Sequence, residues 1–174
     1  LSSGINGGIF GCMTMRNSSQ GVAYTSSILG NNLSVGLGIS STFKSKDSVM
    51  WIQTGDGAIE EGAFYESLHF SVTRRLPVCF IIEDNNWSLG SSINERRHPF
   101  NVKSLTCSVG AKYIRSNSSS VFELMAKAFI ARNLYANRSK PVVLHILTKT
   151  QGISNSSHPV RPYISYHHGP LSSN

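Results

Sequence analysis

The chain has 174 residues, and its 16 Lys and Arg residues against 9 Asp and Glu residues give a formal net charge of +7. A chain of this length can bury roughly 70% of its unfolded surface around one core, so we expect a single domain over residues 1–174. Hydrophobic residues make up 40% of the chain, and no apolar stretch approaches the ~18 residues of a spanning helix. The composition therefore excludes a membrane-embedded or wholly disordered chain.

The basic residues are spread along the chain. Their densest groupings are the pairs Arg74-Arg75 and Arg96-Arg97, and neither lies among aromatic residues that could stack on nucleic-acid bases. We expect both pairs at solvated helix ends and loops, and hence no nucleic-acid partner and no membrane surface. A ligand that carries phosphate would still benefit from the positive charge.

The cysteines bear on the cellular compartment, and the chain ends bear on whether the sequence is part of a longer protein. Cys12, Cys79 and Cys107 lie far apart, are odd in number and show no zinc-ligand spacing. Reduced thiols fit a cytoplasmic location, with an organelle matrix as the alternative. The chain starts at Leu1 without a Met or a signal peptide and ends at Asn174 without a closing element, which indicates an internal fragment of a longer protein.

The first half of the chain alternates between loop, helix and strand patterns. Residues 1–27 are rich in Gly and Ser and are expected to form a loop. Small and apolar residues alternate over 29–44, which favours a tightly packed helix, and 49–54 is typical of a strand. Apolar residues at i, i+4 spacing predict a helix over 59–74. The continuous apolar run 78–82 is typical of a strand buried on both faces of a parallel sheet.

The second half repeats this alternation. A polar loop is expected over 84–108, a short strand over 112–115, a helix over 120–136, a strand over 142–147 and an exposed loop over 150–165. The apolar face of the 120–136 helix is expected to consist of Val121, Leu124, Met125, Ala128, Phe129 and Leu134. Strands that alternate with helices in this way predict an α/β fold, with a parallel sheet covered by helices on both faces.

Polar groups follow two of the expected strands. Asp56 lies in the turn Gly55-Asp56-Gly57-Ala58, and Asn85, 29 residues later, lies in Glu83-Asp84-Asn85-Asn86. In a parallel α/β sheet, ligands bind beyond the carboxyl ends of the strands. If the two strands are neighbours, the side chains of Asp56 and Asn85 face one crevice.

The residue types at these strand ends suit a metal ion and a phosphate. A carboxylate and a carboxamide oxygen are ligands that Mg²⁺ accepts, together with phosphate oxygens and water. A helix that starts after Gly57 would present unpaired N–H groups and a positive dipole end to an anion, and the flanking glycines allow close approach of a phosphate. Each turn taken alone is also common turn chemistry without a ligand.

Several segments resemble one known family. The spacing from Gly55-Asp56-Gly57 to Asn85 resembles the diphosphate-binding signature of thiamine-diphosphate enzymes. Residues 55–92 are similar to the alpha subunit of the 2-oxo acid dehydrogenases of the pyruvate and branched-chain type. Residues 11–15 resemble that family's Gly-Ser-Met-His-Met loop, and residues 27–30 resemble its Gly-Ile-Val-Gly segment. The resemblance implies the thiamine-diphosphate-binding fold.

The resemblance also implies cofactors and their ligands, namely thiamine diphosphate and Mg²⁺. Asp56, Asn85 and the carbonyl of Trp87 would bind the metal, and the amides of Gly57 and Ala58, beside Gly55, would hold the diphosphate. Main-chain groups of Ser27, Ile28 and Leu29 would contact the aminopyrimidine. A histidine of the segment Tyr166–Pro170, either His167 or His168, would lie over the thiazolium as a catalytic residue.

Three positions depart from the family pattern. Thr14 stands where the family has a histidine, which removes or replaces one contact on the phosphate or substrate side. Ser27 replaces a glycine, and a backbone contact survives this change if its φ is negative. Asp84 takes the place of the first residue of the usual Asn-Asn pair, so Asn85 is the expected metal ligand and Asn86 is not.

The function implied by the resemblance is oxidative decarboxylation of a 2-oxo acid, with transfer of the acyl group to a lipoyl carrier. The glutamate that activates the aminopyrimidine belongs to a beta subunit or fused beta domain in this family, so the fragment is expected to be an oligomer partner that is inactive alone. A transketolase-like or deoxyxylulose-phosphate-synthase-like enzyme is one alternative, although Glu61-Gly62 and residues 76–92 fit the dehydrogenases better. A non-catalytic basic α/β binding module is the other alternative.

Overall fold

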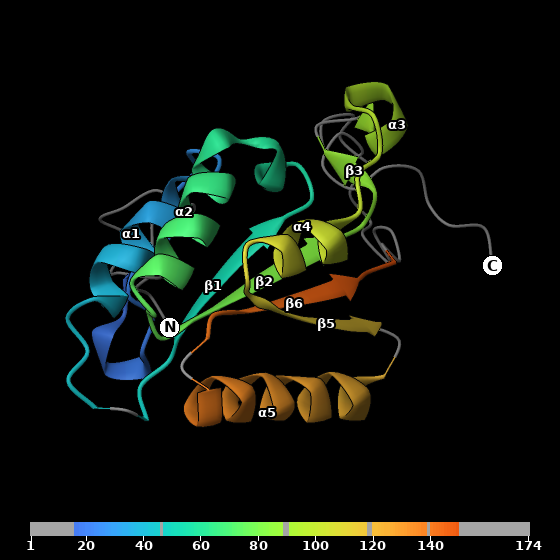
Figure 1. Cartoon of the computed structure of the whole chain (residues 1–174). Helices are drawn as coiled ribbons and strands as arrows, with labels where there is room; N and C mark the ends of the chain where they lie inside the picture. Colours follow the sequence, from blue (N-terminus) through green and yellow to red (C-terminus); the bar gives the residue numbers. More distant parts are fainter. Residues whose placement is uncertain (1–15, 46, 89–90, 118–119, 139, 150–174) are drawn as a thin grey trace, which may run out of the picture.

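A four-stranded parallel sheet forms the centre of the molecule (Figure 1). The computed structural model describes residues 16–45, 47–88, 91–117, 120–138 and 140–149. The strands β1 (Met50–Gly55), β2 (Val78–Asp84), β6 (Val142–Leu147) and β5 (Lys112–Asn117) lie in the order β1-β2-β6-β5. All three neighbouring pairs are parallel, so the predicted α/β fold class is confirmed.

The two central strands are the most apolar ones. Val78, Cys79, Phe80 and Ile82 of β2 are buried, and β6 is buried from Val142 to Ile146. Strands at the centre of a parallel sheet are covered on both faces and lose their alternation of polar and apolar residues. The prediction of a strand buried on both faces, made for 78–82, is therefore confirmed.

Three helices cover one face of the sheet: α1 (Asn31–Ser40), α2 (Gly62–Thr73) and α4 (Val102–Ser108). Their apolar side chains form one cluster with the strands, in which Leu33, Phe64, Leu68 and Phe80 are fully enclosed. Burial of each such side chain contributes about 1.5–3 kcal/mol before entropy is counted. This packing fixes the backbone from which the loops beyond β1 and β2 project.

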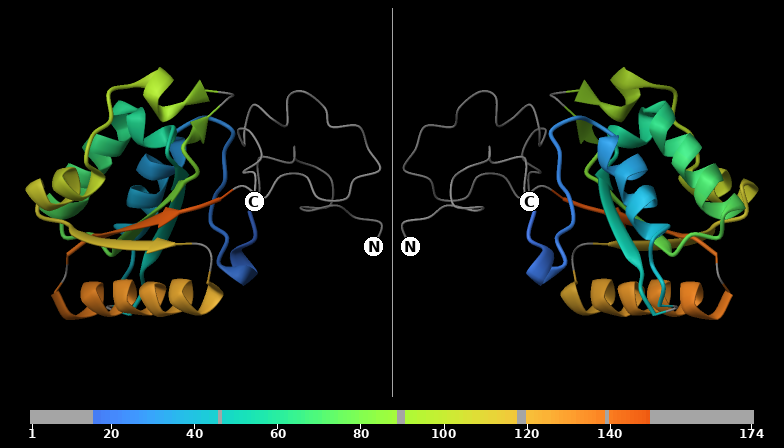
Figure 2. Two further views of the ribbon diagram at one scale, coloured as in Figure 1. Left: turned by 90° about the vertical axis from the view of Figure 1, so that its right-hand side faces the viewer. Right: turned by 90° about the vertical axis from the view of Figure 1, so that its left-hand side faces the viewer.

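The long helix α5 (Val121–Arg138) covers the opposite face, over β5 and β6 (Figure 2). Leu124, Ala128 and Leu134 pack there against a second apolar cluster that includes Cys79 and Leu144. The expected apolar face of this helix is only half right.

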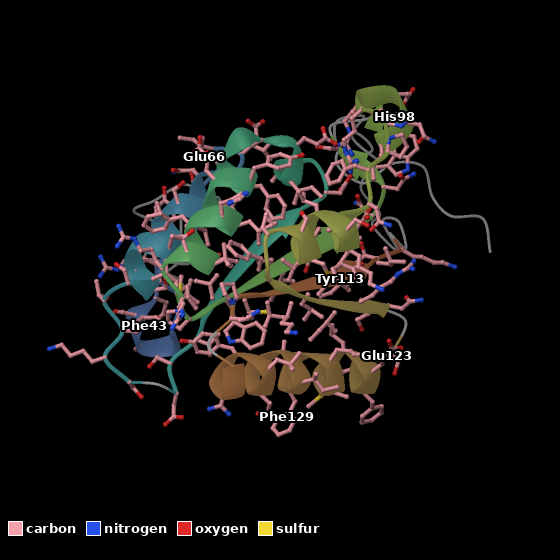
Figure 3. The ribbon with its side chains drawn as sticks, in the orientation of Figure 1. Phe43, Glu66, His98, Tyr113, Glu123 and Phe129 are labelled. Atoms are coloured by element: carbon pink, nitrogen blue, oxygen red, sulfur yellow. The ribbon has the colours of Figure 1, made fainter. Side chains whose placement is uncertain are left out.

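Part of the predicted core face of α5 is exposed. Val121, Met125 and Phe129 are each more than 60% exposed, and Phe129 points away from the sheet (Figure 3). The helix carries two apolar rows, and the row with Ala128 and Ala131 packs on the sheet because small residues allow the backbone to approach the strands closely.

The prediction of a polar loop over 84–108 is wrong, since this segment contains four short elements of secondary structure. These are β3 (Trp87–Ser88), β4 (Ser91–Ser92), α3 (Ile93–Arg96) and α4. The helix α3 begins with a capping box, in which the Ser92 N–H and hydroxyl donate to the Glu95 carboxylate at 2.7 and 2.8 Å. Asn101 caps α4 by accepting a hydrogen bond from the Ser104 N–H.

The helix predicted to start directly after Gly57 also differs in its type and its first residue. A short 3₁₀ helix spans Ala58–Glu60, and α2 starts only at Gly62. The bounds of α1 lie inside the predicted 29–44, whereas β5 extends beyond the predicted 112–115. Among the helices of the described ranges, none has the length and apolar character to cross a membrane.

Candidate functional site

The two polar strand ends lie side by side. In the parallel pairing of β1 with β2, Gly55 is opposite Glu83, and the Asp56 N–H donates to the Glu83 carbonyl at 3.2 Å. Asp56 and Asn85 therefore follow the carboxyl ends of adjacent strands. The expectation that the two strands are neighbours is confirmed, which places both residues on one edge of the sheet.

Asp56 is nearly enclosed, with 3% of its surface exposed. Its Oδ2 accepts a hydrogen bond of 2.5 Å from Arg96, the last residue of α3, and Arg96 also donates to Glu60 Oε1 at 2.7 Å. Arg97 Nε donates to the same Glu60 oxygen at 2.7 Å. Burial raises the pKa of Asp56, and the Arg96 ion pair opposes this rise without cancelling it.

The Asn85 side chain organises the turn after β2. Its Oδ1 accepts a hydrogen bond of 2.9 Å from the Trp87 N–H, and Asp84 Oδ1 accepts one of 3.0 Å from the Asn86 N–H. Asn86 has a φ of 67°, a left-handed conformation that asparagine tolerates. These bonds fix the direction of the Asn85 carboxamide and of the half-buried Trp87 backbone in β3.

Gly57 lies where the backbone meets other chain segments closely. A Cβ atom at this position would lie 2.4 Å from Ser88 Oγ and 3.2 Å from Arg96 Nη1. The Glu60 N–H closes the 3₁₀ turn by donating to the Gly57 carbonyl at 3.2 Å. The N–H groups of Gly57 and Ala58 come before this first bond of the turn and are the donors that a helix start offers to an anion.

The segment Ser27–Gly30 leads into α1 beside this turn. Gly30, with a φ of 74°, packs near Glu61, since its Cβ position lies 3.4 Å from Glu61 Cβ. Among the described non-glycine residues only Arg75 and Asn86 have a positive φ, so Ser27 fits its position without backbone strain. Ile28 and Leu29 expose 67% and 53% of their surface.

A hydrogen-bonded chain that the sequence analysis missed crosses the sheet beside the site. His145 Nε2 lies 2.8 Å from Asp84 Oδ2, and His145 Nδ1 lies 2.9 Å from the Tyr113 hydroxyl. Because a carboxylate only accepts, Nε2 carries the proton toward Asp84; when the imidazole is neutral, Nδ1 accepts from the Tyr113 hydroxyl. Burial raises the pKa of Asp84, but the hydrogen bonds to His145 and to the Asn86 N–H, with the attraction of His145 and Arg97, together outweigh it, so the net pKa is lowered.

The Asp84–His145–Tyr113 hydrogen bonds border a cavity of about 370 Å³ beside the carboxyl ends of β2 and β6 and the side chains of Tyr113 and Arg115 in β5. The cavity is also lined by Arg97 and Lys103. His145 lies inside an apolar strand, so no local pattern marks it as a partner of Asp84, which is 61 residues away.

The remaining predicted site residues lie outside the described part of the chain. These are His167 and His168, together with the 11–15 loop that contains Thr14.

The donor set of the described site fits a hard cation. It offers one buried carboxylate (Asp56) and one oriented carboxamide (Asn85), which leaves coordination positions for further oxygens, as Mg²⁺ prefers. The Trp87 carbonyl is the third ligand that the family resemblance implies. Within the described ranges, no group of three His, Cys, Asp or Glu side chains could hold a metal. A site here therefore depends on this mixed set of oxygens.

The fold and site together define an α/β domain with an oxygen-donor, glycine-lined site at the carboxyl edge of its parallel sheet. The model of one family, described as dehydrogenase E1 component, matches residues 5–155. The chain therefore belongs to the dehydrogenase E1 component family. His167 and His168 lie beyond the matched residues.

Individual relatives agree with this family. The chain is 26% identical over 117 residues to the pyruvate dehydrogenase E1 component subunit alpha of Rhizobium meliloti, covering 67% of this chain and 34% of that protein. It is 25% identical over 122 residues to the mitochondrial 2-oxoisovalerate dehydrogenase subunit alpha 1 of Arabidopsis thaliana, covering 70% of this chain and 26% of that protein. The chain thus spans about a third of the first relative and about a quarter of the second.

Solved structures show the same fold at low sequence identity. A transketolase from Campylobacter jejuni superposes with a TM-score of 0.57 at 20% identity, covering 71% of this chain and 20% of the transketolase. A Mycobacterium smegmatis enzyme assigned to the thiamin diphosphate-dependent class superposes with a TM-score of 0.56 at 18% identity, covering 75% of this chain and 24% of that one. At this identity the likeness concerns the fold alone.

Proposed function

We propose that this chain is the diphosphate-binding module of a 2-oxo acid dehydrogenase that uses thiamine diphosphate and Mg²⁺. The observation that carries the proposal is the pairing of β1 with β2, which brings Asp56 and Asn85 to one edge of the sheet. Family membership and the two alpha-subunit relatives support it independently.

The residues divide between the parts of the cofactor. Asp56, Asn85 and the Trp87 carbonyl hold the metal, and the amides of Gly57 and Ala58 bind the diphosphate with Gly55 leaving room for it. The backbone of Ser27, Ile28 and Leu29 contacts the aminopyrimidine at the start of α1. When bound, thiamine diphosphate supplies the carbanion sink for decarboxylation, and the chain's own groups bind and orient it.

The complete reaction in this proposal needs further parts. A beta subunit or fused beta domain completes the site, a lipoyl carrier takes the acyl group, and His167 or His168 approaches the thiazolium side. We expect this fragment alone to show no decarboxylase turnover. We place the protein in the cytoplasm or an organelle matrix, in line with the mitochondrial relative from Arabidopsis.

The transketolase alternative is supported only at the level of the fold. The matching family model and the alpha-subunit relatives favour the dehydrogenase. Assays of the full-length protein with 2-oxo acids and with ketose phosphates would separate the two activities.

Binding of the cofactor tests the proposal directly. Isothermal titration of the chain with thiamine diphosphate should give binding with Mg²⁺ and none with EDTA. Asp56→Ala should weaken binding more than tenfold, a loss of more than about 1.4 kcal/mol. Asp47→Ala is the matched control, because Asp47 is an exposed turn residue and should bind like the parent.

Two results would contradict the proposal. One is metal-independent binding, or none, by the folded parent chain. The other is equal affinity of Asp56→Ala and Asp47→Ala, which would leave a non-catalytic α/β module as the better description.

A further inference from the structure

Arg96 already neutralises the carboxylate that the proposed metal needs. Its Nη2 lies 2.5 Å from Asp56 Oδ2, and the side chains of Arg96 and Asp56 are only 14% and 4% exposed. A second bond of 2.7 Å ties Nη1 to Glu60, which also pairs with Arg97. Two guanidinium groups and two carboxylates therefore balance within one partly buried cluster.

This cluster opposes the arrival of a metal ion on its own. Mg²⁺ at Asp56 would stand beside a guanidinium in a poorly solvated place, where like charges repel more strongly than in water. If Arg96 moved away instead, a buried ion pair would be broken, which is unfavourable because it leaves a charge without its partner. Either course weakens the binding of the metal alone.

The guanidinium also lies beside the turn proposed to bind the diphosphate. Arg96 Nη1 is 3.2 Å from the Cβ position of Gly57, and Arg96 Nε is buried without a hydrogen-bond partner. The ion pairs thus leave one donor of Arg96 unsatisfied, and an unsatisfied buried donor is unfavourable. A diphosphate at Gly57 would bring anionic oxygens to compensate both cations.

We propose that Arg96 competes with Mg²⁺ for Asp56, so that the metal binds appreciably only together with the diphosphate. This inference rests on the proposed function and deepens it. Arg96 is then a positioning residue that couples the two ligands. The coupling is reciprocal, since each ligand must raise the affinity of the other by the same factor.

The test is a titration with Mg²⁺, first without and then with saturating thiamine diphosphate, monitored by calorimetry and by tryptophan fluorescence. Arg96→Gln removes the competing charge and should bind Mg²⁺ at least tenfold more tightly than the parent chain. The factor by which thiamine diphosphate raises the Mg²⁺ affinity should fall by the same amount. Arg96→Lys keeps the charge but loses the forked geometry, and its Mg²⁺ affinity should rise at least threefold.

Arg97→Gln is the matched control for the electrostatic field. It removes the same charge from the same Glu60 oxygen but touches Phe100 rather than Asp56, so its affinity for Mg²⁺ should change less than twofold. Circular dichroism would verify that each variant is folded.

The outcomes separate the two proposals. Parent-like or weaker Mg²⁺ binding in both Arg96 variants overturns the competition, as does an equal gain in Arg97→Gln. If Arg96→Gln does not fold, Arg96→Lys decides alone. Failure of the parent to bind thiamine diphosphate with Mg²⁺ would instead reject the proposed function.

Discussion

Substitution of Gly57 by alanine tests how tightly the turn after β1 is packed. The backbone at Gly57 has φ of −71° and ψ of −35°, which any residue can adopt. The expected effect is therefore purely steric. The new methyl group would lie 2.4 Å from Ser88 Oγ and 2.8 Å from Ser88 Cβ.

The size of the loss follows from these contacts. Rotation of the Ser88 side chain can remove the clash with Oγ, but Cβ is fixed to the backbone of β3, so the chain itself must shift. Overpacking of this kind costs about 1–3 kcal/mol. For a chain of this size, about 2–4 °C of melting temperature is lost per kcal/mol, so we expect Gly57→Ala to melt roughly 2–12 °C lower.

Urea unfolding of four proteins measures this loss: the parent, Gly57→Ala, Ser88→Gly and the double variant. Ser88→Gly removes both clashing atoms, so the double variant should recover most of the stability that Gly57→Ala loses relative to its own background. Cofactor affinity should follow the same order of loss and recovery. If Gly57→Ala is as stable as the parent, or if Ser88→Gly gives no rescue, the close contact between the two segments is not real.

Three further predictions concern packing, ionisation and thiol reactivity. In α1, Gly36→Ala should destabilise by about 1–3 kcal/mol because its Cβ would lie 2.5 Å from the Ile52 side chain, whereas Gly38→Ala, with open space around it, should stabilise by up to about 1 kcal/mol; urea unfolding checks the opposite signs. Burial raises the pKa of Cys79 to about 12, so the folded state holds the proton more tightly than the unfolded one. The stability from this thiol is complete below pH 9 and falls as the pH rises from 9 toward 12, by roughly 1 kcal/mol per pH unit, a loss that Cys79→Ala should lack. In native protein at pH 8, iodoacetamide should modify the exposed Cys107 and not Cys79, and the reverse reactivity would contradict the buried position of β2.

The central sheet could be predicted because its signals are local. The apolar runs at 78–82 and 142–147 have one stable place in a parallel sheet, and turns rich in Gly, Asp and Asn mark their ends. The adjacency of Asp56 and Asn85 followed from the expected pairing of β1 with β2, which the structure confirms. The roles of these residues as ligands stay predictions.

Interactions between distant residues could not be predicted in the same way. Arg96 meets Asp56 and Glu60 across 40 and 36 residues of sequence, so the Arg96-Arg97 pair looked like ordinary solvated charge. The helix α3 is only four residues long and has no periodicity to detect, although Ser92 and Glu95 have the spacing of a capping box.

The prediction of the buried face of α5 was partly wrong for another reason. Two apolar rows on one helix are equivalent in periodicity, and only the strands beneath decide which row is buried. The choice depends on how closely the two backbones approach, which is a property of the assembled layers. Residues 124, 128 and 131 meet that condition, and 121, 125 and 129 do not.

The candidate site and the helix α5 contact different parts of the sheet. The groups around Asp56 come from the ends of β1 and β2 and from α3, while α5 packs beneath β5 and β6. Local opening of α5 would expose the apolar cluster beneath it, including the Cys79 thiol, to water. The Asp56–Arg96 contact does not involve α5 and would persist. Local opening of α5 and breakage of the Asp56–Arg96 contact are thus separate events. The helix can open without a change at the carboxyl edge of β1 and β2.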